Sequence, residues 1–230
     1  MTQRILNAIP STEIEYEEQA PLDRVEPVPP GRYVLGGIPP VSDQGTDGTC
    51  VAHAVGNVVA WHHKRKHGSF PLIDYRAFYT LTRRAVGVEP DPTFTQGLSL
   101  LWALRTAKGS GVPLVGGGRT PRITGFSFVG SAFDDCQRAL WQLATPVALR
   151  VDWDANWFYL PTSKVMKQPV GQVVGGHAVY AYGYDDDTLG AGLECAIERN
   201  SWGAAWRTMY HPDAYLDAAA LEGWIVTGIE

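Results

Sequence analysis

Apolar residues recur with helical spacing in the first half of the chain and with strand spacing in the second half. The pattern predicts helices at 50–66 and 71–86, and a turn at 96–99 that opens a third helix. Strands are predicted at 123–129, 145–153, 173–184, 193–199 and 214–217, with a short helix at 133–143. Helices that precede strands indicate an α+β fold with two lobes, helical at about 45–115 and β-rich at about 120–230.

The first 31 residues differ from the rest of the chain. Six acidic residues and four prolines fall between positions 13 and 30, and this composition opposes regular secondary structure. We therefore expect an N-terminal arm, 1–31, ahead of one two-lobed domain, 32–230. The arm is expected to be solvated, to lie along its own domain as a miniature blocking segment, or to dock on a partner in an assembly.

A single cysteine begins the first predicted helix. Cys50 follows a polar stretch of glycines and threonines, so its thiol lies at a helix N-terminus, where unpaired backbone N–H groups favour an anion. A thiol in that position tends to ionise, and the thiolate is the nucleophilic form. A lone cysteine at a helix start is also typical of a small buried core residue, which makes Cys50 only a candidate.

Two polar residues far downstream strengthen that candidate. His177 begins a predicted strand, and Asn200 follows another apolar run at the start of the sequence Asn-Ser-Trp-Gly. Cysteine, histidine and asparagine residues that are distant in sequence but adjacent in space form the Cys-His-Asn arrangement of nucleophilic catalysis.

With these residues the chain resembles the papain-like (C1-type) cysteine peptidases. Gln44 with Gly48-Thr49-Cys50 is similar to the Gln…Gly-x-Cys loop of that family, the sequence at 177–179 is similar to its His-Ala-Val strand, and 200–203 is its Asn-Ser-Trp-Gly motif. The three motifs occur in the order of the family, and the resemblance covers about residues 32–230.

Two positions near the cysteine depart from the pattern of the family. Val51 stands where an aromatic residue is usual, and Asp47 stands where a disulfide-forming cysteine is usual, with no partner cysteine at 93–96. The resemblance therefore implies a disulfide-free branch of bacterial or phage type. The remaining cysteines, Cys136 and Cys195, are expected to be free and buried.

The resemblance implies a role for each motif residue. Cys50 would attack a carbonyl carbon as the thiolate, and His177 would move the proton to the leaving amine. Asn200 would orient the imidazole, and the Gln44 side chain with the Cys50 N–H would face the oxyanion. The residues implied at the substrate or around the triad are Gly97, Gly176 and Trp202. A turn glycine, a turn glutamine and a core tryptophan are the simpler interpretations.

Composition and charge limit the kinds of molecule that the chain is expected to bind. A net charge of −5 gives no indication of a nucleic-acid partner, and no apolar segment approaches the about 20 residues that span a membrane. The N-terminus lacks the apolar core of a signal peptide, so we expect a chain in the cytoplasm or in a virion or similar assembly. His63 and His67 lack a third ligand, so we expect neither a metal nor a cofactor.

Three functions remain open from the sequence. The first is a cysteine peptidase, or related amide hydrolase, that acts on a peptide or protein. The second is a papain-fold component of a larger assembly, such as a phage particle, in which the arm docks on a partner. The third is an acyl or peptidyl transferase that resolves the same acyl-enzyme with an amine.

Overall fold

The structure is a computed structural model that describes residues 4–11, 30–130 and 132–230. Its helices are α1 (Cys50–His67), α2 (Tyr75–Ala85), α3 (Leu100–Gly109), α4 (Phe133–Gln142) and α5 (Asp213–Ala219). Its strands are β1 (Arg32–Val34), β2 (Ile123–Gly130), β3 (Val147–Asp154), β4 (Val173–Asp185), β5 (Cys195–Arg199), β6 (Met209–Pro212) and β7 (Ala220–Ile229). Most of the predicted acidic arm, 12–29, lies outside the described residues.

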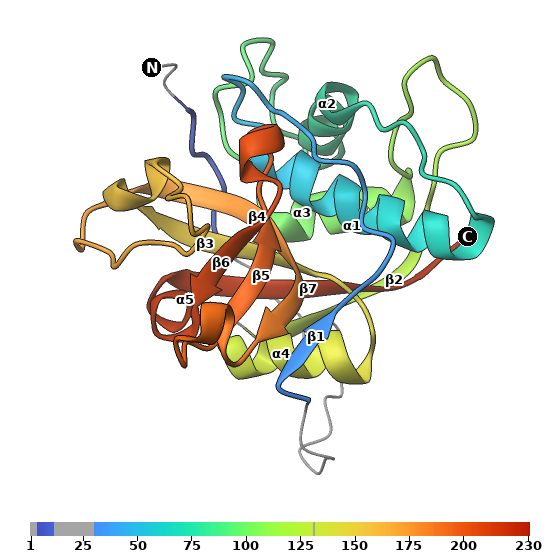
Figure 1. Cartoon of the computed structure of the whole chain (residues 1–230). Coiled ribbons are helices and arrows are strands. Elements are labelled where there is room, and N and C mark those ends of the chain that lie inside the picture. The colour runs from blue at the N-terminus through green and yellow to red at the C-terminus, as the bar shows by residue number, and fades with distance from the viewer. Residues whose placement is uncertain (1–3, 12–29, 131) are drawn as a thin grey trace.

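All seven strands join one antiparallel sheet. Its order is β2-β7-β3-β4-β5-β6, and β1 pairs with β4 beside this path. Helices α1, α2 and α3 pack on one face of the sheet, and α4 lies on the opposite side (Figure 1). The predicted α+β class is confirmed, whereas the lobe boundaries stay a prediction.

Helix α1 is the central element of the helical layer. Every residue from Cys50 to Trp61 is buried, because the helix lies between α2, α3 and the sheet. The helix ends at Gly68, whose left-handed conformation (φ 82°) lets its N–H bond to the Lys64 carbonyl. The buried first turn therefore holds Cys50 at a fixed position between the two layers.

The structure corrects two expectations about helices. The range 214–217, predicted as a strand, lies in α5, where Ala218 and Ala219 favour a helix and where Leu216 and Ala219 are buried. The strand that follows, β7, has no counterpart among the predicted strands. Helix α2 begins at Tyr75 and not at 71, because the Asp74 side chain accepts a hydrogen bond from the Ala77 N–H (2.9 Å) and caps the helix.

Two further expectations concern cysteines and membranes. Cys136 and Cys195 are free and buried, as predicted, and Cys50 is free and buried as well. Among the helices that the structure describes, none is long and apolar enough to cross a membrane.

Candidate active site

The structure brings Cys50 next to strand β4. The thiol is fully buried at the first turn of α1, close to the backbone of Ala178 on β4 and of Asn7 in the N-terminal segment. Burial raises the pKa of the Cys50 thiol, while hydrogen bonds from these backbone groups act in the opposite direction. The thiol is therefore neutral in this closed arrangement.

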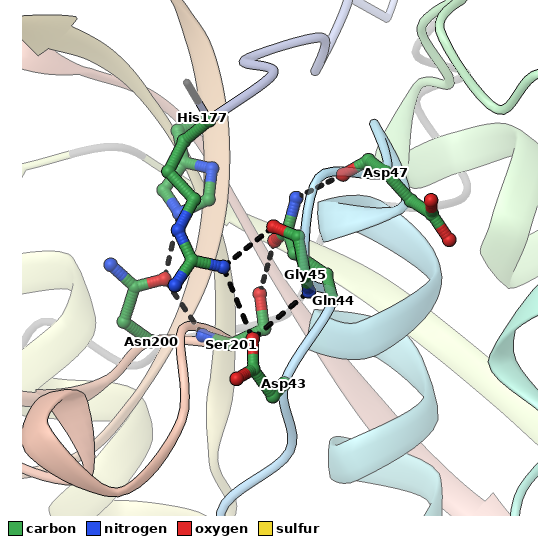
Figure 2. A network of polar contacts seen from close by, with 8 residues as sticks. Asp43, Gln44, Gly45, Asp47, His177, Asn200 and Ser201 are labelled. Carbon is green, nitrogen blue, oxygen red and sulfur yellow. Dashed lines mark hydrogen bonds and ion pairs between the residues drawn. The ribbon is translucent and has the colours of Figure 1, made fainter. Parts of the chain in front are cut away.

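His177 and Asn200 are joined by a buried hydrogen bond. His177 Nε2 lies 2.8 Å from Asn200 Oδ1, which also accepts the Ser201 backbone N–H at 2.7 Å (Figure 2). A backbone N–H can only donate, so this atom of Asn200 is the oxygen and Nε2 must carry the proton. The other ring nitrogen, Nδ1, is buried and has no hydrogen-bond partner among the described residues. In the neutral ring, Nδ1 is thus the atom that can accept a proton.

The imidazole of His177 is uncharged at neutral pH. Burial lowers its pKa to about 4, the hydrogen bond to Asn200 works against this shift, and the positive charge of Arg4 adds to it. The ring of Trp202 lies 4.8 Å from the imidazole, centroid to centroid, and that of Trp153 lies 4.9 Å away. Trp202 thus lies where it can keep water from the His177–Asn200 bond.

Gln44 connects the cysteine loop to the Asn-Ser-Trp-Gly motif. Its Oε1 accepts a hydrogen bond from Ser201 Oγ at 2.5 Å, and its Nε2 donates to the Asp47 carbonyl at 2.5 Å (Figure 2). The amide nitrogen has a second N–H that these contacts do not use. Gln44 is therefore held between the cysteine loop and Ser201, with one donor left for a ligand.

The cysteine loop is tied down by an ion pair and not by a disulfide. Asp47 accepts hydrogen bonds from Arg76 on α2 at 2.7 Å and 3.3 Å, and the Gly48 N–H donates to the Phe94 carbonyl at 2.6 Å. Asp47 thus occupies the place of the missing cysteine with a charge that Arg76 balances.

Residues 4–11 lie across this site (dark blue in Figure 1). The Ala8 N–H donates to the Gly176 carbonyl (2.9 Å), the Ile9 N–H donates to the Leu98 carbonyl (2.9 Å), and the Leu98 N–H donates to the Asn7 carbonyl (3.1 Å). Ala8 and Leu98 form a parallel β-bridge, and only 4% of Ala8 is exposed. Of the alternatives for the arm, these residues adopt a course along their own domain.

Gly97 and Gly176 form the walls of the groove that holds this segment. A Cβ atom at Gly97 would overlap the Asn7 carbonyl oxygen, and one at Gly176 would overlap the Ala8 carbonyl oxygen. Neither glycine has a positive φ, so the requirement is for space and not for backbone freedom. The close backbone approach expected at Gly97 occurs here with the N-terminal segment.

The backbones of Asn7 and Ala8 have their own partners in the domain. The backbone of Asn7 hydrogen-bonds to the buried thiol of Cys50. The Asn7 carbonyl accepts the Leu98 N–H (3.1 Å), and the Ala8 carbonyl accepts a hydrogen bond from Arg150 Nε (3.0 Å). Both oxygens are therefore bonded to groups other than the Gln44 amide.

Two residues of the groove escape the motif analysis. Arg150 on β3 is 6% exposed and bonds to Ala8, and Glu222 on β7 is 4% exposed and accepts the Ser11 N–H (2.6 Å) and Oγ–H (2.5 Å). They are direct partners in the β3–β7 register. A signal for Arg150 exists in the sequence, because it is a charged residue between apolar residues on both sides.

The other histidines near α1 have structural surroundings. His53 is buried and stacks on Tyr75 with ring centroids 3.9 Å apart, so it forms part of the local packing around α1. His63 and His67 contact the Ser69 and Glu230 carbonyls. Within the described ranges, no group of three or more histidine, cysteine or acidic residues is arranged to hold a metal.

Acid should destabilise the fold through three histidines whose pKa values are lowered by burial. The pKa of His53 falls to about 3 and those of His62 and His177 to about 4, whereas an unfolded histidine titrates near 6.5. The unfolded chain then binds more protons below pH 6.5, so the free energy of unfolding should fall by about 1.4 kcal/mol per pH unit per histidine as pH drops towards 4. Urea unfolding at pH 7, 6 and 5 measures this slope, and His53→Phe should remove one histidine's share. Equal stability at pH 5 and pH 7 would contradict the assignment.

Comparison with known proteins defines the class of fold. The chain superimposes on xylellain, a cysteine protease from Xylella fastidiosa, with a TM-score of 0.79 at 17% identity over 100% of this chain and 99% of that chain. Procathepsin B from Trypanosoma congolense gives 0.73 at 13% identity over 99% and 87%. Bromelain from Ananas comosus gives 0.66 at 19% identity over 86% and 99%. No protein-family model matches the sequence, and no curated protein matches it.

The chain therefore has the papain-like fold. Its helical layer, its antiparallel sheet and the position of Cys50 between them agree with the resemblance carried by the three sequence motifs. The absence of a disulfide also agrees with the predicted branch, since all three cysteines of the sequence are free.

Proposed function

We propose that this chain is a cysteine peptidase that hydrolyses amide bonds through a Cys50 acyl-enzyme, and that residues 4–11 hold it inactive. One observation carries the proposal. The His177–Asn200 hydrogen bond fixes the proton on Nε2 and leaves a buried, unpartnered Nδ1 on the residue that precedes Ala178, whose backbone hydrogen-bonds to the Cys50 thiol. An imidazole nitrogen that can accept a proton, on the residue next to one that contacts the thiol, supports the acid–base pairing that nucleophilic catalysis requires.

Each step of the reaction uses a group described above. His177 Nδ1 takes the proton of the Cys50 thiol, and Sγ bonds to the carbonyl carbon of the substrate. The second N–H of the Gln44 amide and the Cys50 backbone N–H donate to the oxygen, which carries negative charge at this stage. Nδ1 then protonates the leaving amine as the C–N bond breaks. Water, deprotonated by the same nitrogen, cleaves the thioester and restores the thiol.

The groove that now holds residues 4–11 would also hold the substrate. Leu98 and Gly176 offer backbone groups to an extended chain, and Gly97 allows that chain to lie close to the enzyme. A peptide running along these groups with a carbonyl near Gln44 would place its carbon at Cys50. The substrate class that fits is an extended peptide or an unfolded stretch of a protein.

A non-catalytic role in an assembly is the second candidate. The observation in its favour is that the Cys50 and His177 side chains are completely buried beneath the N-terminal segment. A closed site of this kind also suits a protein that only binds. Two measurements after release of the segment separate the functions: the reactivity of the Cys50 thiol and the turnover of a peptide substrate. A peptidase shows both, whereas a binding protein cleaves no peptide.

Gln44→Ala should separate catalysis from simple thiol reactivity. We define an arm-release variant, Ala8→Pro with Ile9→Pro, which removes two of the three backbone hydrogen bonds of the segment. In this background, Gln44→Ala should lower kcat/KM for peptide cleavage by about 100- to 1,000-fold, because it removes an oxyanion donor. Alkylation of Cys50 by iodoacetamide forms no oxyanion and should change little.

Both quantities are measured on the same preparations, by mass spectrometry of a peptide mixture and of the labelled chain. Glu89→Gln, an exposed carboxylate away from the groove, serves as the matched control. An arm-release variant whose Cys50 is alkylated rapidly but which cleaves no peptide would support the assembly role instead.

A further inference from the structure

The guanidinium of Arg4 lies in a defined site at the edge of the catalytic cleft. Arg4 Nη1 donates to Asp43 Oδ1 at 3.1 Å and to the Gly45 carbonyl at 2.6 Å. Its Cζ lies 5.7 Å from the centroid of the Trp202 ring. A carboxylate, a carbonyl and an aromatic face are the three groups that bind a guanidinium well.

The acceptors of this site are held by contacts that do not involve Arg4. Asp43 forms an antiparallel bridge with Trp202, and its Oδ1 also accepts the Gly45 N–H at 2.9 Å. Gly203, with φ 80°, leaves room for the carboxylate, since a Cβ there would lie 2.8 Å from Asp43 Oδ2. The side chain of Asp43 remains 54% exposed. The site is therefore built by the enzyme itself and stays accessible when the segment leaves.

The site also adjoins the reacting groups. Gly45 follows Gln44 in the chain, and Trp202 contacts the His177 ring (centroids 4.8 Å apart). Figure 2 shows Asp43 and Gly45 close together between the Gln44 amide and the His177–Asn200 pair. The other anchors of the segment, at Leu98, Gly176 and Glu222, hold residues 7–11, and Asn7 is the residue whose backbone hydrogen-bonds to the thiol. The guanidinium site thus occupies the Trp202 side of the thiol.

We propose that Asp43, Gly45 and Trp202 form a substrate subsite for an arginine side chain, which Arg4 fills in the closed state. The inference rests on the proposed function, because it concerns which substrate side chain the proposed peptidase prefers. Departure of the segment leaves the Asp43 carboxylate and the Gly45 carbonyl without their cation, beside the place where a substrate chain passes. A substrate arginine restores both hydrogen bonds and the contact with the indole face. Lysine should bind less well, because its compact ammonium lacks a planar face to lie on the ring.

A simple lock for the segment is the competing explanation. A lock predicts that Asp43 affects only how firmly residues 4–11 are held. A subsite predicts that Asp43 also affects which peptides are chosen once Arg4 is absent. The two are separated in the full-length arm-release variant that also carries Arg4→Ala.

The test uses peptides that carry arginine, lysine or citrulline at each position in turn on both sides of the cleaved bond. Citrulline has the shape of arginine without its charge. At one position, we expect kcat/KM to be at least about tenfold higher with arginine than with citrulline, with lysine between them. Asp43→Asn should bring the ratio close to one, and Glu89→Gln should leave it unchanged.

Failure of this inference differs from failure of the proposed function. Cleavage without an arginine preference, or with a preference that survives Asp43→Asn, would overturn the subsite and leave the peptidase intact. If no peptide is cleaved, calorimetric Kd values of the same peptides test whether the arginine subsite exists. A tenfold difference between arginine and citrulline that Asp43→Asn removes supports the subsite, and equal Kd values overturn it.

Discussion

The arm-release variant should alkylate at Cys50 about 100-fold faster than the unaltered chain at pH 7. Ala8→Pro and Ile9→Pro each remove an N–H, and thereby leave the Gly176 and Leu98 carbonyls without a donor. A lost hydrogen bond that leaves a buried partner costs about 1–3 kcal/mol, so two such losses raise the open population by about 30-fold to 10⁴-fold. Timed labelling with iodoacetamide and mass spectrometry of the intact chain measures the rate.

A matched variant controls for side-chain effects. Ala8→Gly with Ile9→Val alters the same two side chains but keeps both N–H groups, and it should accelerate labelling far less than the proline pair. Equal rates in the proline variant and the unaltered chain would show that residues 4–11 do not limit access to the thiol.

The pH dependence of labelling should change together with its rate. In the closed chain, burial raises the pKa of Cys50, and burial with the charge of Arg4 lowers the pKa of His177 to about 4. Both shifts favour neutral thiol and neutral imidazole, so labelling of the closed chain should rise only at alkaline pH. Release of the segment admits water and removes Arg4, which favours transfer of the thiol proton to Nδ1. The released chain should then react rapidly even at pH 6, below the usual thiol pKa of about 8.5.

Cys50→Ala and His177→Ala should each abolish peptide cleavage in the arm-release background. Loss of a nucleophile or its base lowers kcat by about 10⁴- to 10⁶-fold in comparable enzymes. The two residues act as one unit, so the double variant should be no worse than either single one. Initial rates with a cleaved peptide give the comparison, and thermal unfolding of each variant shows that the fold is kept.

Cys136→Ala is the matched control for this pair. Cys136 is a free, buried cysteine on α4, on the side of the sheet away from the cleft, so its loss should leave kcat/KM unchanged. Cleavage that persists in Cys50→Ala would show that the activity comes from another group or from a contaminant.

The sequence predicts those parts of the site that local pattern determines. Cys50 is identified by its place at the start of an apolar helix, and His177 and Asn200 by short motifs at strand ends. The contact between His177 and Asn200, and the position of Cys50 beside β4, depend on pairing between distant segments. The sequence implies this pairing only through the resemblance. The strand expected at 214–217 is wrong because the alternation there suits a strand, while alanine propensity and burial of Leu216 favour the helix.

The occupied groove depends on contacts that no local pattern reveals. Ala8 pairs with Leu98, 90 positions away in the numbering, and both residues are ordinary apolar types. Arg150 and Glu222 face the same groove only because β3 and β7 pair in a particular register. Composition predicts neither the register of β3 and β7 nor the course of residues 4–11. Its clearest signal is the acidic stretch that begins at residue 13, which comes after the segment in the cleft.

The ion pair between Asp47 and Arg76 bears on the redox conditions that the protein tolerates. A thiol nucleophile stays functional only while it is kept from oxidation, and reductants that protect it also break structural disulfides. Here the loop of the proposed nucleophile is anchored by charge, and all three cysteines of the sequence are free. A strongly reducing medium therefore preserves Cys50 without loosening the loop that carries it. High salt, in contrast, weakens this anchor, because it screens the ion pair that the exposed guanidinium of Arg76 forms with Asp47.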